Sequence, residues 1–202
     1  MNNKVQNVLL GVLAVGLIGI TVAYAALTQQ LTINGTAKVA ATKWDVHFAK
    51  LSAGATTGYA STDGKTLAIA GDKSTSIEGN LGTLRAPGDT ITYTFDIENA
   101  GDINAVIDSV TGGQGVTCTS TTQSVADAVC KELTYSIKYT DGNTIAKGDK
   151  LAKATNSSTP TTKNVTLTLT YKATAESASL PSEDVTVTAN GMTINYVQDA
   201  NN

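Results

Sequence analysis

Few residues in this chain have the chemistry of a catalytic or metal site, and they lie far apart in the sequence. His47 is the single histidine, whereas a zinc peptidase needs three protein ligands and a general base, commonly arranged as H-E-x-x-H. No acidic pair lies at a useful spacing around His47. The sequence also lacks a G-x-S-x-G serine motif and a glycine-rich phosphate loop. We therefore expect no enzymatic activity, no metal and no cofactor, and we expect His47 to face solvent on a strand.

Cys118 and Cys130 are the two cysteines of the chain, and their simplest chemistry is a disulfide. A bridge between them closes a loop of about 12 residues, which stabilises a fold by roughly 3 kcal/mol on the chain-entropy estimate. Disulfides persist in oxidising compartments outside the cytoplasm. We predict a structural bridge between Cys118 and Cys130, with residues 119–129 as a surface connection.

The N-terminal residues have the pattern of a secretory signal peptide over residues 1–25. Lys4 precedes an apolar run over residues 8–20, and Ala23 and Ala25 give an A-x-A cleavage pattern. Cleavage after Ala25 is the first interpretation. The alternative is a retained membrane anchor, because residues 8–27 are about long enough to span a bilayer. Under both interpretations the rest of the chain is extracellular, secreted or associated with the cell surface, and meets the membrane only through this segment.

Charged residues are scarce over the whole chain. They make up 15% of the 202 residues, hydrophobic residues make up 41%, and the formal net charge is −3. This balance gives no electrostatic basis for binding nucleic acid or an anionic membrane surface. Threonine, serine, asparagine and glycine supply the polarity instead, and the β-branched threonine favours the exposed face of a strand. The composition therefore favours β-sheet.

Apolar and polar residues alternate over most of the chain after residue 25, and in residues 90–98 every second residue is apolar. Such alternation is typical of strands with one buried and one solvated face. Similar strands are expected at residues 44–48, 133–139 and 164–171, with weaker candidates at residues 66–69, 74–84 and 105–110. Helical periodicity is weak, and residues 125–133 could form one helical turn. Roughly eight strands predict an all-β domain over residues 41–202, a two-sheet, jelly-roll-like sandwich preceded by the hydrophobic signal helix.

The Asn190-Gly191 pair can be interpreted in two ways. A two-residue hairpin would pair Ala189 with Met192 and Val187 with Ile194, which brings apolar side chains to one face. The same residues fit a strand whose register changes at a bulge on Gly191. The sequence leaves both arrangements open.

Residues 26–40 follow the expected cleavage site and form an amphipathic pattern. Their apolar residues occupy odd positions: Leu27, Leu31, Ile33, Ala37 and Val39. The pattern predicts one long strand. This strand could be the first of the domain's own sandwich. It could also leave its subunit and complete the sheet of the next, because a strand at a free terminus can do so without unfolding a loop. Repeated head to tail, the second arrangement gives a filament.

Three stretches carry a resemblance to a known family. They are the glycine-rich signal that ends in residues 23–25, the segment LGTLRAPGDTITYTFDIENAGDINAVI over residues 81–107, and the C-terminal block over residues 167–197. In the central segment, Pro87, Gly88 and Asp89 make a turn into a strand, and residues 99–102 make a turn out of it. In this order they resemble the TasA/camelysin family of Gram-positive matrix fibre proteins. The resemblance implies a jelly-roll subunit whose N-terminal strand is donated to a neighbour, in fibres that support a biofilm matrix.

These observations predict an extracellular subunit that polymerises with copies of itself, with signal peptidase as its processing partner and room for an accessory or anchoring protein. The acceptor would be an incomplete groove lined by alternating apolar residues, among them Ile91, Phe95, Leu167 and Leu169. One alternative is a monomeric surface adhesin or accessory protein held by an uncleaved membrane helix. A third is a camelysin-type metallopeptidase, which would need His47 for catalysis.

Overall fold

The computed structural model describes residues 13, 14, 36, 38, 41–62, 64, 67–71, 73–156, 158–173 and 180–200. The chain divides into two units, residues 1–40 and residues 41–202. Among the described residues, no helix is both long enough and apolar enough to cross a membrane. Outside the described residues lie the predicted cleavage residues Ala23 and Ala25 and the predicted polymerisation residues Leu27, Leu31, Ile33, Ala37 and Val39.

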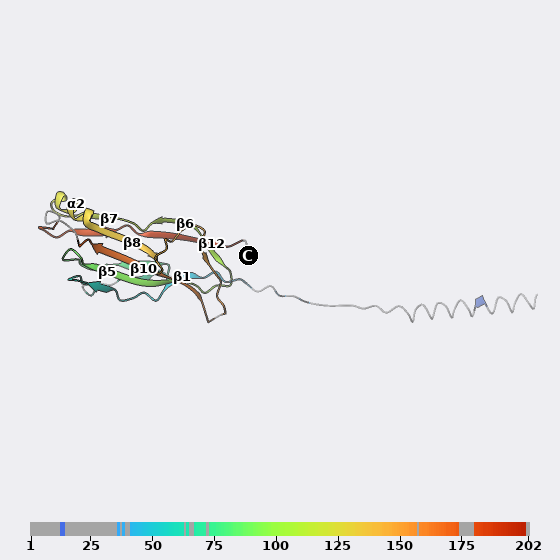
Figure 1. The fold of residues 1–202 in the computed structure, drawn as a ribbon. Coiled ribbons are helices and arrows are strands. Elements are labelled where there is room, and N and C mark those ends of the chain that lie inside the picture. Colours follow the sequence, from blue (N-terminus) through green and yellow to red (C-terminus); the bar gives the residue numbers. More distant parts are fainter. Residues whose placement is uncertain are drawn as a thin grey trace, which may run out of the picture. The chain divides into compact units, whose positions relative to one another are not determined.

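The larger sheet of the second unit is antiparallel and has five strands (Figure 1). At its centre β5 (Thr90–Asn99) pairs with β10 (Thr161–Tyr171), and β8 (Leu133–Tyr139) lies beyond β10. The other edge of β5 carries two short strands, β1 (Val46–Ala49) and β2 (Ala55–Thr57). The strands predicted at residues 44–48, 90–98, 133–139 and 164–171 are therefore confirmed.

Shorter strands form the second layer. β6 (Ala105–Gly112) lies between β12 (Met192–Gln198) and β9 (Lys150–Leu151), while β7 (Val116–Thr119) pairs with β11 (Thr186–Ala189). Because β7 follows β6 and β12 follows β11, these four strands make one antiparallel ribbon with an interruption. A separate hairpin consists of β3 (Leu67–Ala70) and β4 (Ser76–Gly79).

The interruption in the ribbon occurs at Asn190 and Gly191. Ala189 lies opposite Val116 and Met192 lies opposite Gly112. Between these pairs, the two residues Asn190 and Gly191 therefore face three residues, 113–115, of the neighbouring chain segment. The Gly191 carbonyl accepts a hydrogen bond from the Gly113 amide across the gap, at 3.1 Å. The pair is therefore a bulge between consecutive strands and not a hairpin turn, which decides between the two sequence interpretations.

Both layers contribute side chains to one hydrophobic core. Alternation in β5 and β10 points every second residue inward, as predicted, and β6 and β9 cover these residues from the other side. The buried members are Leu67, Ile91, Tyr93, Phe95, Ile97, Ala105, Ile107, Tyr135, Tyr139, Ile145, Leu151, Val165, Leu167 and Leu169. The described part of the second unit is thus all-β apart from one helix.

That helix is α2 (Gln123–Glu132), in the stretch where the sequence predicted a surface connection with at most one helical turn. It has ten residues and buries Ala126 and Val129. The predicted disulfide is present and joins Cys118 of β7 to Cys130 of α2 within the same chain, with 5.8 Å between their Cα atoms. The helix and the bridge close a second, smaller core at one end of the domain.

Candidate functional site

An open groove lies between the edge strands of the two layers. β1 is an edge strand of the five-stranded sheet, and β12 is an edge strand of the β12-β6-β9 sheet. The groove has a volume of 210 Å³. Six of its nine lining residues are aliphatic or aromatic and three are polar: Trp44, Val46, His47, Phe48, Thr75, Ile97, Ile194, Asn195 and Tyr196.

Alternation in β1 gives the groove its first wall. Val46 and Phe48 pack against the core, and the ring of Phe48 meets that of Phe95 edge to face with 5.5 Å between centroids. Trp44, which precedes the strand, stays 44% exposed at the mouth of the groove. The sequence predicted the inward direction of Val46 and Phe48, but it gave no sign that this strand lies at an open edge.

β12 gives the opposite wall. Met192, Ile194 and Tyr196 pack against the core, while Thr193, Asn195 and Val197 are exposed. Burial and the nearby Asp149 carboxylate raise the pKa of Tyr196 to about 12, so its hydroxyl stays neutral at physiological pH. This wall is therefore uncharged, with Ile194 and Tyr196 as its apolar members and Asn195 as its polar member.

A clamp fixes the chain just before β1. The amides of Ala100 and Asp102 donate to the carbonyls of Asp45 and Lys43, at 2.8 and 2.9 Å. A Cβ atom on Gly101 would lie only 2.6 Å from the Lys43 carbonyl, so the close approach requires glycine.

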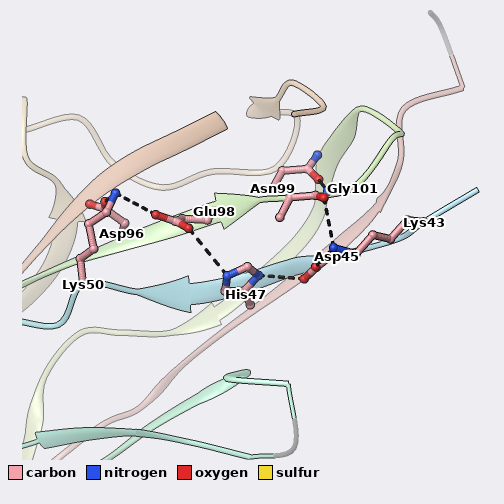
Figure 2. Close-up of polar contacts among 9 residues, drawn as sticks. Lys43, Asp45, His47, Lys50, Asp96, Glu98, Asn99 and Gly101 are labelled. Atoms are coloured by element: carbon pink, nitrogen blue, oxygen red, sulfur yellow. Dashed lines mark hydrogen bonds and ion pairs between the residues drawn. The ribbon is translucent and has the colours of Figure 1, made fainter. Parts of the chain in front are cut away.

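Asn99 orders the loop that makes this clamp. Its side-chain amide donates to the carbonyls of Ile103 and Leu151, and its Oδ1 accepts from the Gly101 amide (Figure 2). Asn99 itself is 1% exposed. The predicted turn over residues 99–102 therefore also holds the start of β1 in place.

A row of charged side chains runs along the other face of β1 and β5 (Figure 2). His47 Nδ1 lies 2.8 Å from Asp45 Oδ1, and His47 Nε2 lies 3.7 Å from Glu98 Oε2. Lys50 Nζ then lies 2.8 Å from Glu98 Oε1 and 2.9 Å from Asp96 Oδ2. The row joins residues of two strands that are about fifty positions apart, which is why the sequence did not predict it.

Burial explains why these charges are paired. Asp96 and Glu98 are each only 7% exposed, and an unpaired buried carboxylate is strongly destabilising. The hydrogen bonds to Glu98 and Asp96 raise the pKa of Lys50, so its ammonium stays charged beside them. The hydrogen bond from Lys43 lowers the pKa of Asp45 the most, and the hydrogen bond to His47 lowers it further.

His47 lies on the face of β1 opposite Val46 and Phe48, as predicted, but it is only partly exposed to solvent. Its side chain is 22% exposed and has an acidic residue on either side, although no acidic pair was visible along the sequence. Over the described ranges, no group of three or more His, Cys, Asp or Glu side chains is placed to hold a metal ion. The row of charges has internal partners and supports β1 against β5.

The four residues predicted to line an acceptor groove are placed elsewhere. Ile91, Phe95, Leu167 and Leu169 are between 0 and 6% exposed in the shared core. An acceptor site at these positions would require the two layers to separate, and it stays a prediction. The open groove is lined instead by Ile97 and by residues of β1 and β12.

Comparisons with protein-family models, with curated proteins and with solved structures found no match. The groove, the two edge strands and the clamp before β1 are therefore the features from which a function can be inferred.

Proposed function

We propose that this chain is an extracellular structural subunit that polymerises into fibres of the biofilm-matrix type. Each subunit would be a jelly-roll-like sandwich that receives the N-terminal strand of a neighbouring copy, residues 26–40. The observation that carries the proposal is the groove between two edge strands, lined largely by aliphatic and aromatic residues, because an incomplete seam of this kind is what strand addition fills.

The size and chemistry of the groove support a strand and not a small ligand. Its 210 Å³ is below the roughly 300–1,000 Å³ of typical small-molecule sites. Its lining is dominated by aromatic and aliphatic side chains without a convergent set of charged groups. Residues 26–40 offer aliphatic side chains at every second or fourth position, which is the spacing that one face of a strand presents.

The position of the clamp also supports the proposal. In the sequence, two residues separate the end of residues 26–40 from Lys43, where the segment fixed by the loop over residues 99–102 begins. A contact in which one subunit gives a strand and another receives it is heterologous, and repeated without closure it produces a filament. The disulfide between Cys118 and Cys130 is compatible with an extracellular location.

Negative-stain electron microscopy of the chain beginning at Ala26, beside the chain beginning at Ala40, tests this function. We expect filaments from the first and folded monomers from the second. Folded monomers from both would contradict polymerisation through residues 26–40 and would favour a membrane-anchored surface adhesin. Proteolytic activity lost in His47→Ala would favour the metallopeptidase.

A further inference from the structure

The two walls of the groove differ in the backbone edges that they offer to an incoming strand. The Ala100 amide donates to the Asp45 carbonyl on the β5 side. Because backbone groups alternate in direction along a strand, those of Val46 and Phe48 point to the outer edge of β1. The Phe48 amide is already occupied there, since it donates to the Ser74 carbonyl at 2.8 Å.

Ser74 holds this position at a conformational cost. Its φ of 55° lies in the left-handed region, which non-glycine residues rarely adopt. The turn between β3 and β4 thus caps the outer edge of β1, and β1 itself is only four residues long. The capped edge leaves little room for a further strand.

The outer edge of β12 is open by comparison. The Gly191 carbonyl accepts a hydrogen bond from the Gly113 amide, and the Asp199 amide donates one to the Asn104 carbonyl. The backbone groups of the odd-numbered residues of β12 therefore point toward β6. The pairing irregularity between Asn195 and Tyr196 skips Asp108 of β6 and leaves the alternation of β12 intact. The backbone groups of Met192, Ile194 and Tyr196 therefore point outward, and within the described residues β12 pairs with β6 alone.

We propose that the N-terminal strand of a second copy adds to the outer edge of β12 and extends the β12-β6-β9 sheet by one strand. Its apolar side chains would cover Ile194 and Tyr196 and reach across the groove to Val46 and Phe48. This inference rests on the proposed function and specifies its acceptor surface. Residues 26–40 carry their aliphatic side chains at odd positions, which suits an open strand edge beside the side chains of Ile194 and Tyr196.

Hydrogen exchange measured by mass spectrometry locates the occupied edge. Filaments of the chain beginning at Ala26 are compared with the soluble Leu31→Asp form of the same chain. We expect amide exchange to slow in peptides covering residues 192–198 in the filament. Slowing at residues 46–49 without slowing at residues 192–198 would overturn the assignment, because the strand would then add to β1.

Matched substitutions on β12 give a second readout. Ile194→Lys puts a charge into the groove, whereas Val197→Lys puts the same charge on a side chain that is already 44% exposed on the other face. We expect loss of filaments for Ile194→Lys only, with cooperative unfolding retained in both variants. Filaments from a folded Ile194→Lys chain would overturn the inference. If this variant does not fold, the exchange comparison decides.

The outcomes separate this inference from the function on which it rests. If filaments need residues 26–40 but exchange at residues 192–198 is unchanged, the acceptor surface is wrong and the fibre function stands. If the chain beginning at Ala26 stays monomeric with residues 192–198 protected, the strand docks in its own subunit and both are overturned. A monomer without such protection also overturns both.

Discussion

His47 lies directly opposite Glu98 in the β1–β5 ladder, with His47 Nε2 3.7 Å from Glu98 Oε2. The same short strand carries Val46 and Phe48 on its other face, where they line the groove. One four-residue strand therefore connects a row of paired charges to an apolar wall. Substitutions in the row of charges should consequently change the stability of the strand that forms the wall.

Removal of the Lys50 ammonium is expected to destabilise the domain. Lys50→Met leaves Asp96 and Glu98 buried without their cation, and each carboxylate is only 7% exposed. We expect a lower thermal midpoint by circular dichroism. Lys147→Met is the control, since the side chains of Lys147 and its partner Asp108 are 75% and 54% exposed. Equal midpoints for the two variants would contradict a supporting role for the row of charges.

Asp89 is expected to make stability depend on acid pH. Burial opposes ionisation of this carboxylate, but amide hydrogen bonds from Arg85, Tyr59 and Ala86 outweigh burial and hold its pKa below the usual 3.8. A group with a lowered folded-state pKa contributes stability above its unfolded pKa, and this contribution is lost as the pH falls through the folded pKa.

Asp89→Asn should therefore cost about 2 kcal/mol of unfolding free energy at pH 7, because hydrogen bonds to a charged acceptor are replaced. The difference from the wild type should shrink toward pH 3. Urea denaturation at both pH values measures it, with the exposed Asp108→Asn as the control. A difference that does not change with pH would contradict this account of Asp89.

The disulfide is expected to contribute about 3 kcal/mol to stability, because it closes a loop of 12 residues. The Cys118→Ser, Cys130→Ser double variant should unfold at lower denaturant concentration than the oxidised wild type. Reductant should lower the wild-type midpoint and leave that of the double variant unchanged. If reductant has no effect on the wild type, α2 is held by packing alone.

Gly101→Ala tests the clamp before β1. The added methyl group would lie 2.6 Å from the Lys43 carbonyl and 2.9 Å from the Asp45 amide nitrogen, so residues 43–45 must move away. We expect a loss of roughly 1–3 kcal/mol, as for other overpacked sites, with faster proteolysis near residue 45. Gly191→Ala is a suitable control because no atom lies within 4 Å of its added Cβ. Equal behaviour of the two variants would argue against a close-packed clamp.

Leu31→Asp and Ile33→Asp are expected to abolish filaments and leave soluble, folded monomers, because each places a charge on the apolar face of the donated strand. Thr32→Asp changes the opposite face and should polymerise normally. Electron microscopy and analytical ultracentrifugation distinguish these outcomes. Normal filaments from both apolar-face variants would contradict strand donation.

Local patterns in the sequence were sufficient for the strands of the large sheet. Alternation predicted β1, β5, β8 and β10 because each buries one face, and it placed Val46 and Phe48 correctly. The same rule missed α2, whose buried residues Ala126 and Val129 are few and lie within a polar segment. A short helix held by a disulfide and by packing leaves a weak periodic signal.

The features of the candidate site depend on contacts between distant residues. The Lys50 interactions with Asp96 and Glu98 join β1 to β5, and the groove exists because β1 and β12 are both edge strands. Neither the ion pairs between β1 and β5 nor the groove between β1 and β12 leaves a pattern in the local sequence. The acceptor residues were placed in β5 and β10 because these strands alternate most regularly, but regular alternation is typical of central strands, which the other layer covers.

The cap that Ser74 places on Phe48 has a consequence for growth under the proposed assembly. A groove with one blocked edge and one open edge accepts a single incoming strand, so branching at the groove is disfavoured. Each filament would then be polar, with a donor strand unused at one tip and a vacant β12 at the other. Removing the cap would create a second acceptor, and linear fibres would give way to networks.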